Sequence, residues 1–209
     1  MARPQPRRIL PAIAVLCSGQ GTNLQALLDA VRAGRLRARI AVVVSDRAGA
    51  HALTRARRAG IPAVFVDPAR ASSREAFDHR LLDILDAYRV RLVCLAGFMR
   101  ILSPVFVRRF PNRILNIHPA LLPAFPGAHA IRDALAWGAK VTGVTVHLVD
   151  ERVDHGPILL QEAVGIQARD RHASLLARVH RVEHRLYPEA VALMLSGRVR
   201  VAGRRTVVR

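Results

Sequence analysis

The stretch that decides the fold is Ile9-Leu-Pro-Ala-Ile-Ala-Val-Leu16, followed by Ser18-Gly-Gln-Gly-Thr-Asn23 and a helical pattern over residues 23–33. The first segment is a nearly continuous apolar run, which is typical of a strand buried on both faces of a sheet. In the third segment, apolar residues recur at helical spacing at Leu24, Leu27, Leu28 and Val31. A buried strand, a glycine-rich turn and an amphipathic helix together predict the first unit of an α/β sheet.

The same alternation continues along the chain. Apolar runs predict further strands at 40–44, 64–66, 92–96, 114–117, 144–149 and 158–164. Helical patterns cover 51–59, about 72–88 with a capping box Ser72-x-x-Glu75, a start at Ser103-Pro104, and about 171–195. We expect one domain over 1–209, an open, mostly parallel twisted sheet with helices on both faces and an antiparallel part toward the C-terminal half. Ligands bind such sheets at the carboxyl ends of the strands.

Composition limits the class of protein. The chain has 209 residues, of which 51% are hydrophobic, and this excludes a disordered protein. No apolar run approaches the ~20 residues that span a bilayer, so we expect no membrane segment. Arg7-Arg8 before 9–17 mimics a short signal peptide, but no small-x-small cleavage site follows. Cys17 and Cys94 both lie in predicted strands, as reduced core thiols do, which favours the cytoplasm.

The net charge of +18 is unusual for a protein of this length. It could indicate nucleic-acid binding through phosphate neutralisation. Nearly all the cations are arginines, however, and they are scattered along the chain without interleaved aromatic residues for base stacking. We therefore expect no nucleic-acid partner, and a basic surface that steers anionic small molecules toward a cleft.

Three polar groups with catalytic potential follow apolar runs between 115 and 161. They are the amide of Asn116, the imidazole of His118 and the carboxylate of Asp154. An amide can donate a hydrogen bond to a developing oxyanion, and an imidazole can move a proton near neutral pH. A nearby carboxylate stabilises the imidazolium form and raises the pKa of the histidine. This set suffices for acyl transfer to an amine without a metal.

Two other segments suit ligand binding. The loop Ser18 to Asn23 lies before a helix, where backbone N–H groups can hold a phosphate, although Leu24 replaces the third glycine of a Rossmann fingerprint. The segment 95–104 offers an apolar wall with one cation, Arg100, which suits a flat heterocycle with an acidic tail. Core packing would explain the second segment equally well.

One further pattern, His180-x-x-Glu183-His184, matches a zinc motif. So short a pattern arises easily by chance in a chain with nine histidines, and we expect no metal. Of the remaining histidines, His147 lies on a predicted strand as a hydrogen-bonded structural residue, and His129 follows a turn before the next helix.

The motif Asn116-x-His-Pro-x-Leu-Leu-Pro123, with Phe125-Pro-Gly127 and Asp154-x-Gly-Pro157, resembles the folate-dependent formyltransferases. The loop at 18–23 resembles the phosphate loop of those members that act on glycinamide ribonucleotide, and the similarity covers about 9–200. It implies transfer of a formyl group from 10-formyltetrahydrofolate to the amine of that ribonucleotide, in purine synthesis. One departure is Ala124, where the family often has a basic residue.

The resemblance also implies roles for individual residues. Asn116, His118 and Asp154 would be catalytic. The ribonucleotide would contact Gly21, Thr22, Asn23, His180, Arg181, Val182 and Glu183. The folate would contact Arg74, Met99, Arg100, Ile101, Leu102, Asn116, Asp150, Glu151, Arg152, Val153 and Asp154. Residues 1–113 would then form the phosphate-binding half of the domain, and 114–209 the catalytic and folate-binding half.

Related activities remain as alternatives. Formyltetrahydrofolate deformylases typically carry an N-terminal regulatory domain and methionyl-tRNA formyltransferases a C-terminal RNA-binding domain, and we expect neither here because about eight residues precede the first strand and only 197–209 follow the last helix. A basic nucleic-acid-binding module and a zinc hydrolase using His180, Glu183 and His184 are alternatives from other classes. The sequence leaves open whether the enzyme is a monomer or a homodimer.

Overall fold

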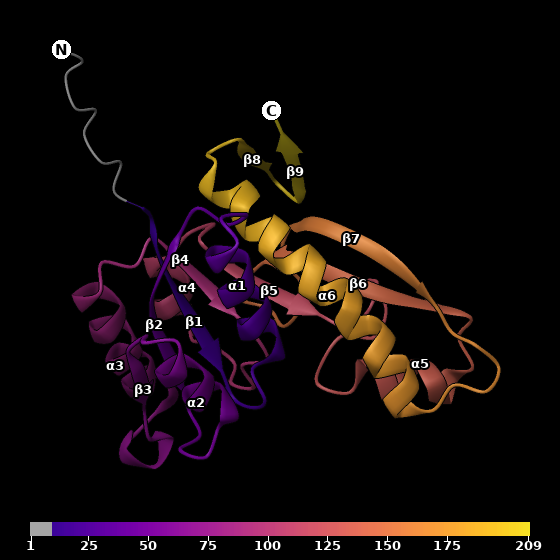
Figure 1. The fold of residues 1–209 in the computed structure, drawn as a ribbon, viewed down its shortest axis with the longest axis horizontal. Helices are drawn as coiled ribbons and strands as arrows, with labels where there is room; N and C mark the ends of the chain where they lie inside the picture. Colours follow the sequence, from indigo (N-terminus) through magenta and orange to yellow (C-terminus); the bar gives the residue numbers. More distant parts are fainter. Residues whose placement is uncertain (1–9) are drawn as a thin grey trace.

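The computed structural model describes residues 10–209, whose main feature is a seven-stranded sheet with the strand order β3-β2-β1-β4-β5-β6-β7 (Figure 1). Arg7-Arg8 of the signal-peptide pattern lie outside the described residues. The strands are β1 (Ala12–Cys17), β2 (Arg39–Ser45), β3 (Ala63–Phe65), β4 (Leu92–Leu95), β5 (Ile114–His118), β6 (Val141–Leu148) and β7 (Ile158–Gly165). The helices are α1 (Thr22–Arg32), α2 (His51–Arg58), α3 (Arg74–Ala87), α4 (Pro104–Arg109), α5 (Ala130–Trp137) and α6 (His172–Leu195).

The sheet is parallel from β3 to β5 and antiparallel from β5 to β7. The predicted fold class, including the antiparallel part in the C-terminal half, is therefore confirmed. The change of direction at β5 matters for function. It makes the residues of β6 run back alongside Asn116 and His118, so that Asn116 pairs with His147 and His118 with Thr145.

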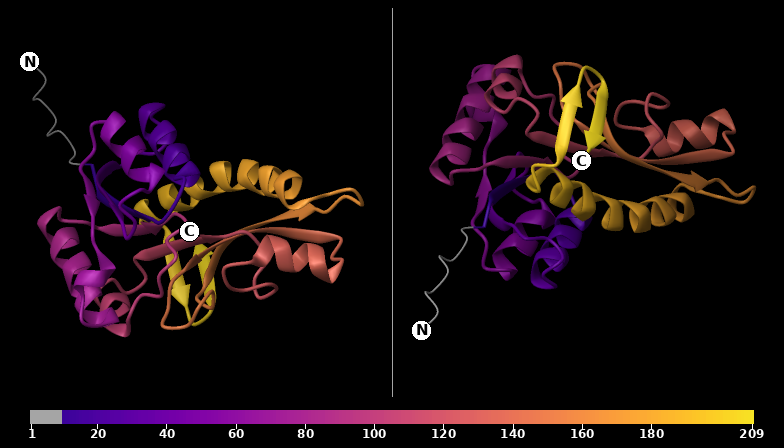
Figure 2. Two further views of the ribbon diagram at one scale, coloured as in Figure 1. Left: turned by 90° about the horizontal axis from the view of Figure 1, so that it is seen from below. Right: turned by 90° about the horizontal axis from the view of Figure 1, so that it is seen from above.

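Helices cover both faces of the sheet, as Figure 2 shows for α6 and for α3 on opposite sides. Alternate residues of β1 belong to two different cores: Ile13 and Val15 pack with α1 and α6, while Ala14 and Leu16 pack with α3 and α4. Successive side chains of a strand point to opposite faces. The apolar run is continuous because both of its faces are buried, which is why the sequence pattern predicted this strand.

Three local features differ from the sequence-based expectation. Ser73, not Ser72, caps α3: its backbone is extended and its Oγ accepts a hydrogen bond from the Ala76 N–H at 3.0 Å. The chain also forms a 3₁₀ turn at Pro68–Arg70. After α6, the strands β8 (Val199–Ala202) and β9 (Arg205–Val208) form an antiparallel hairpin that the sequence analysis did not predict.

The long helix α6 is tied to the sheet next to the functional site. Tyr187 is fully buried, and its hydroxyl lies 2.8 Å from the Leu95 carbonyl oxygen of β4 and 3.1 Å from the Leu115 carbonyl oxygen of β5. A buried tyrosine hydroxyl normally has such a partner. These contacts hold α6 against β4 and β5, and β5 carries Asn116 and His118 at its carboxyl end.

Residues 10–209 were also compared with the expectations for membrane helices and for the two cysteines. No helix in this part of the chain has the length and apolar character needed to cross a bilayer. Cys17 and Cys94 are buried free thiols, and burial raises the pKa of Cys17 to about 12. A thiol that stays protonated is a poor nucleophile. Both cysteines therefore act as core residues.

Candidate active site

A cavity of about 650 Å³ lies at the carboxyl ends of β1, β4 and β5. The sheet order places β1 between β2 and β4, so the chain continues to opposite sides of β1 at this edge. Such a switch point leaves a crevice that ligands use. The cavity is lined by four groups of residues: the loop 19–23, the segment 95–102, the strand ends and loops at 116–119, 127–128, 147 and 149–154, and the helical residues His180 and Glu183.

The three predicted catalytic residues meet in this cavity. Asn116 and His118 lie two positions apart on β5, so their side chains point to the same face. Asp154 comes from the loop between β6 and β7. Its Oδ2 lies 3.4 Å from His118 Nδ1, and its Oδ1 accepts a hydrogen bond of 3.3 Å from Asn116 Nδ2. The antiparallel turn of the chain thus brings together groups that are 38 positions apart.

His118 is buried, with 4% of its surface exposed. Its Nε2 lies 2.8 Å from the carbonyl oxygen of Phe125, which can only accept, so Nε2 carries the proton and Nδ1 faces Asp154. Burial lowers the pKa of His118, and this effect outweighs the raising influence of Asp154 and of the Phe125 carbonyl. The sequence analysis expected the carboxylate to raise this pKa. The carboxylate acts in that direction, but the desolvation of the ring is larger.

Asp154 is held by both the strand and the neighbouring loop. Its Oδ2 accepts a hydrogen bond of 2.8 Å from the Gly127 N–H, and its backbone has a φ of 49°, in the left-handed region. Burial acts to raise the pKa of Asp154, but the contacts with His147, the Gly127 N–H and His118 together lower it. The carboxylate is therefore ionised at neutral pH. Left-handed backbone at a non-glycine residue is uncommon and is often found at functional sites.

Gly156, two residues after Asp154, lies where the backbone leaves no room for a side chain. A Cβ atom on Gly156 would lie 1.9 Å from the carbonyl oxygen of Leu148, so any side chain would push this segment away from β6. The close approach of the two backbones directs the chain back into β7, and it leaves the Asp154 carboxylate facing His118.

His147 belongs to the same cluster, which the sequence analysis did not expect. Its Nδ1 lies 2.8 Å from the Leu148 carbonyl oxygen, so Nδ1 carries the proton and Nε2 accepts from Asn116 Nδ2 at 3.1 Å. The ring is also 3.6 Å from Asp154 Oδ1. His147 therefore orients the Asn116 amide. The signal that could have found it is the strand pairing, because residue 147 lies opposite residue 116 across β5 and β6.

The glycine loop forms one end of the cavity, with all three predicted residues Gly21, Thr22 and Asn23 in the lining. Gly21 has a φ of 70° at the N-cap of α1, and a Cβ there would lie 2.8 Å from Ala52. No side chain caps this helix. The first N–H groups of α1 are consequently available for an anion.

A serine connects this loop to the apolar wall of the cavity. Ser18 Oγ donates a hydrogen bond of 2.6 Å to Asp46 Oδ1 and accepts one of 2.9 Å from the Met99 N–H. In the sequence, Ser18 stands out only as the start of the glycine loop. The contact with Met99 spans 81 positions and could not be read from either motif.

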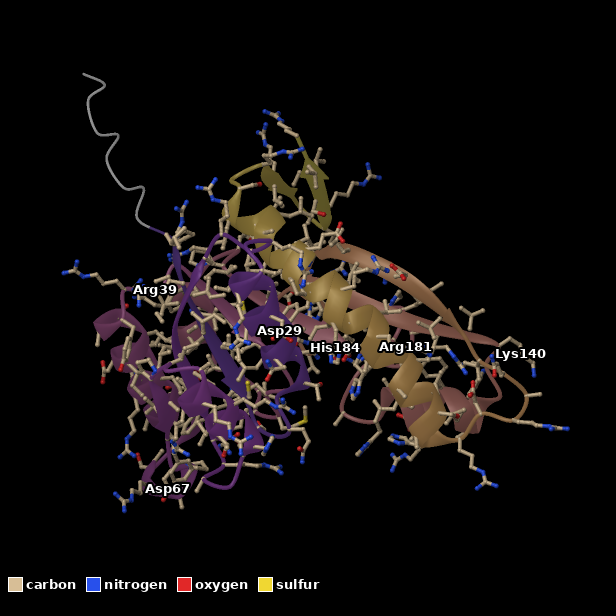
Figure 3. The ribbon with its side chains drawn as sticks, viewed as in Figure 1. Asp29, Arg39, Asp67, Lys140, Arg181 and His184 are labelled. Atoms are coloured by element: carbon tan, nitrogen blue, oxygen red, sulfur yellow. The ribbon has the colours of Figure 1, made fainter. Side chains whose placement is uncertain are left out.

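Helix α6 contributes only part of the predicted segment 180–183. His180 and Glu183 line the cavity, and buried Glu183 accepts a hydrogen bond of 3.0 Å from Asn23 Nδ2. Burial raises the pKa of Glu183 despite that hydrogen bond. Arg181 and Val182 are not in the lining, and Arg181 is exposed on the outer side of the helix (Figure 3). Residues three apart share a helix face, whereas the two between them turn away.

The possible zinc motif also lies on α6. The rings of His180 and His184 stack with centroids 5.7 Å apart, and His180 Nε2 lies 3.9 Å from Glu183 Oε2. Among residues 10–209, no group of three or more His, Cys, Asp or Glu side chains is placed to hold a metal ion.

The other end of the cavity contains most of the predicted folate contacts. Met99 to Leu102 and Asp150 to Asp154 all line it. Met99 and Ile101 expose more than half of their surface, and the Arg100 guanidinium packs over the Phe77 ring at 4.7 Å. Arg74, at the start of α3, is not part of the lining. The role predicted for it, like those of Arg181 and Val182, stays a prediction.

The chain is similar over most of its length to known proteins of one family. The formyl transferase family model matches residues 12–191. Phosphoribosylglycinamide formyltransferase of Escherichia coli K12 is 43% identical over 90% of this chain and 89% of its own length. The crystal structure of glycinamide ribonucleotide transformylase 1 from Symbiobacterium toebii is 54% identical, with a TM-score of 0.94 over 95% of this chain and 94% of that one.

The chain is also similar to one part of a much longer relative. The trifunctional purine biosynthetic protein adenosine-3 of Drosophila pseudoobscura is 48% identical over 94% of this chain, which spans 14% of that protein. The resemblance that the sequence motifs indicated is thereby confirmed, because both the family model and full-length relatives cover most of the chain. The chain belongs to the formyl transferase family, together with the bacterial phosphoribosylglycinamide formyltransferases.

Proposed function

We propose that this chain transfers the formyl group of 10-formyltetrahydrofolate to the amine of glycinamide ribonucleotide, giving formylglycinamide ribonucleotide and tetrahydrofolate. One observation carries the proposal: a single cavity joins an anion-binding helix end at Gly21 to Asn23, the cluster of Asn116, His118 and Asp154, and an apolar wall at Met99 to Leu102. Two substrates bound at the ends of this cavity would meet at the cluster.

The ribonucleotide end is suited to a phosphate. The uncapped N–H groups of α1 point to this end, and the helix has no acidic residue in its first turn. Asn23 and Glu183 lie beside the loop and are joined by a hydrogen bond of 3.0 Å from Asn23 Nδ2 to Glu183 Oε2. This polar end contrasts with Met99 and Ile101, whose exposed apolar surface would pack against a pteridine ring.

The cluster can carry the chemistry of formyl transfer. The neutral amine of the ribonucleotide attacks the formyl carbon, and the carbonyl oxygen becomes an oxyanion. Asn116 Nδ2 would donate to this oxyanion in place of its long 3.3 Å bond to Asp154. The bond from the formyl carbon to N10 of the folate then breaks, and N10 takes up a proton.

His118 would move the proton between the two nitrogens. Because burial lowers its pKa, the ring is neutral at the start and can accept the proton that the attacking amine loses. The imidazolium formed in this way faces the ionised Asp154 at 3.4 Å and is stabilised by it. The proton then passes to N10, and His118 returns to its neutral form.

An absorbance assay tests the proposal. A 10-formyltetrahydrofolate analogue is incubated with the protein, with and without glycinamide ribonucleotide, after exhaustive chelation. We expect release of the deformylated folate only when the ribonucleotide is present. Equal turnover without it would indicate a deformylase. Loss of activity on chelation that zinc restores would contradict the metal-free mechanism.

The setting of the enzyme is part of the proposal. We place it in the cytoplasm, with small molecules as its only substrates, because both thiols are free and buried and the two ends of the cavity suit a nucleotide and a folate. The absence of a nucleic-acid partner and the choice between monomer and homodimer stay predictions. Salt-dependent binding to random DNA would contradict the first, and sedimentation velocity would decide the second.

A further inference from the structure

The C-terminal hairpin contacts the loop that carries Asp154. Strands β8 and β9 are joined by a tight turn at Gly203 and Arg204, and Gly203 has a φ of 58°. The hairpin lies beside β7 (Figure 1), where Thr206 Oγ1 donates a hydrogen bond of 2.8 Å to the Ile158 carbonyl oxygen. A two-stranded hairpin has little stability by itself. This contact anchors it and directs the turn toward residues 150–155.

Arg204, at the tip of the turn, contacts both the backbone and the ring of His155. Its Nη2 donates a hydrogen bond of 2.7 Å to the His155 carbonyl oxygen, and its Nη1 lies over the ring, 3.0 Å from Nε2 and 3.2 Å from Nδ1. His155 Nδ1 in turn lies 2.7 Å from Asp150 Oδ2. The Asp150 carboxylate can only accept, so Nδ1 carries the proton and donates to it, while the guanidinium packs against the ring.

These contacts hold both ends of the segment 150–154. Asp150 is the first residue of the segment, and its Oδ1 also accepts a hydrogen bond of 2.9 Å from the Arg152 N–H. His155 directly follows Asp154, whose carboxylate faces His118. All five residues of the segment line the cavity, whereas Arg204 does not. Between Asp150 and Asp154, Glu151 forms an exposed ion pair with Arg108 at 2.8 Å.

We propose that Arg204 is a positioning residue, which acts through His155 and Asp150 to hold the segment 150–154 in the shape that binds the folate and presents Asp154 to His118. The inference rests on the proposed function, since it assigns the segment to the folate. Ordering a loop costs conformational entropy. If the hairpin already orders the loop in the free protein, the ligand binds more tightly, because little further conformational entropy is lost on binding.

The experiment compares Arg204→Met with Arg205→Met in the full chain. Arg205 is the next residue, exposed and outside the cavity lining, so it controls for the loss of one positive charge on the hairpin. We expect Arg204→Met to raise KM for the folate roughly tenfold, the scale of one lost charge-assisted hydrogen bond. KM for the ribonucleotide should stay the same, and Arg205→Met should match the wild type.

Two further measurements separate positioning from a general structural role. Hydrogen exchange of residues 150–155 should increase in Arg204→Met while that of β1 and β4 stays the same. In a His155→Ala background, Arg204→Met should add little, because the two residues act through one chain of contacts. An unchanged KM for the folate, or equal increases in both KM values with faster exchange throughout, would overturn the inference. A wild-type protein without formyl transfer would instead contradict the proposed function, and the exchange experiment would still test the contact.

Discussion

The phosphate end of the cavity and the catalytic cluster of Asn116, His118 and Asp154 are built in different ways. The phosphate end consists of consecutive residues, Gly21 to Asn23, whose backbone takes its shape from one left-handed glycine at the start of α1. The catalytic cluster combines β5, β6 and the loop before β7, and Asn116 contacts residues 31 and 38 positions away. The phosphate end depends on local backbone conformation, and the cluster depends on the register of two antiparallel strands. Substitutions in the two regions should therefore change different kinetic constants.

The largest expected effect is a loss of kcat on substitution in the catalytic cluster. Asn116→Ala and His118→Ala should each lower kcat by roughly 10²-fold or more, the scale of losing an oxyanion donor or a general acid–base group. The fold should survive, because both residues lie at the end of a strand. His129→Ala is the matched control, since His129 is exposed in the same loop region and outside the cavity lining. Folded variants with wild-type rates would show that the catalytic assignment is wrong.

A smaller effect, with a definite sign in pH, is expected for Asp154→Asn. The carboxylate opposes the lowering of the His118 pKa by burial, so removing its charge should lower that pKa further. Activity that needs neutral His118 is lost as pH falls through this pKa. The acid limb of the kcat profile should therefore move to lower pH, while kcat at its plateau falls roughly tenfold because the imidazolium loses its partner.

The measurement for Asp154→Asn is an NMR titration of His118 in both proteins. A fall of one unit would correspond to about 1.4 kcal/mol of coupling between the two groups. KM for the ribonucleotide should change little, because Gly21 to Asn23 lie at the phosphate end. An unchanged His118 pKa together with a lower Tm would make Asp154 a structural residue of its turn.

At the phosphate end, Gly21→Ala should act on binding. The new Cβ would lie 2.8 Å from Ala52 in a backbone with φ near 70°, so the loop must shift away from its present path. We expect KM for the ribonucleotide to rise roughly tenfold with a smaller change in kcat, since a strained loop costs on the order of 1–3 kcal/mol. Gly49→Ala is the control, because nothing lies within 4 Å of its new Cβ. A fall in kcat alone would contradict the division between the two regions.

The smallest effect tests the geometry of α6. Arg181→Gln should change KM for the ribonucleotide less than about twofold, because the side chain is exposed and does not line the cavity. The resemblance to relatives implied a contact at this position. A tenfold increase in KM, measured at more than one salt concentration, would show that Arg181 contacts the ribonucleotide, as the resemblance implies, although it lies outside the cavity lining.

The sequence allowed the sheet to be predicted well where burial repeats in a simple pattern. The strands β1, β2, β4 and β5 are mostly buried on both faces, so their apolar runs stand out, and their predicted positions agree with the structure to within a few residues. The hairpin of β8 and β9 was not predicted because its residues alternate between half-buried and exposed, with three arginines among residues 199–208. Its stability comes from contacts with β7 rather than from its own pattern.

By itself, the sequence determined the fold class, the family and the residues that can do chemistry, because each depends on a local pattern of residue types. Only the tertiary structure decided which of those residues act together. It placed His147 against Asn116, turned Arg181 and Val182 away from the cavity, and joined Arg204 to the loop of Asp154. It also reversed the expected direction of the His118 pKa shift. The physical reason is that strand register, helix phase and desolvation are properties of surroundings, which residues distant in the sequence provide.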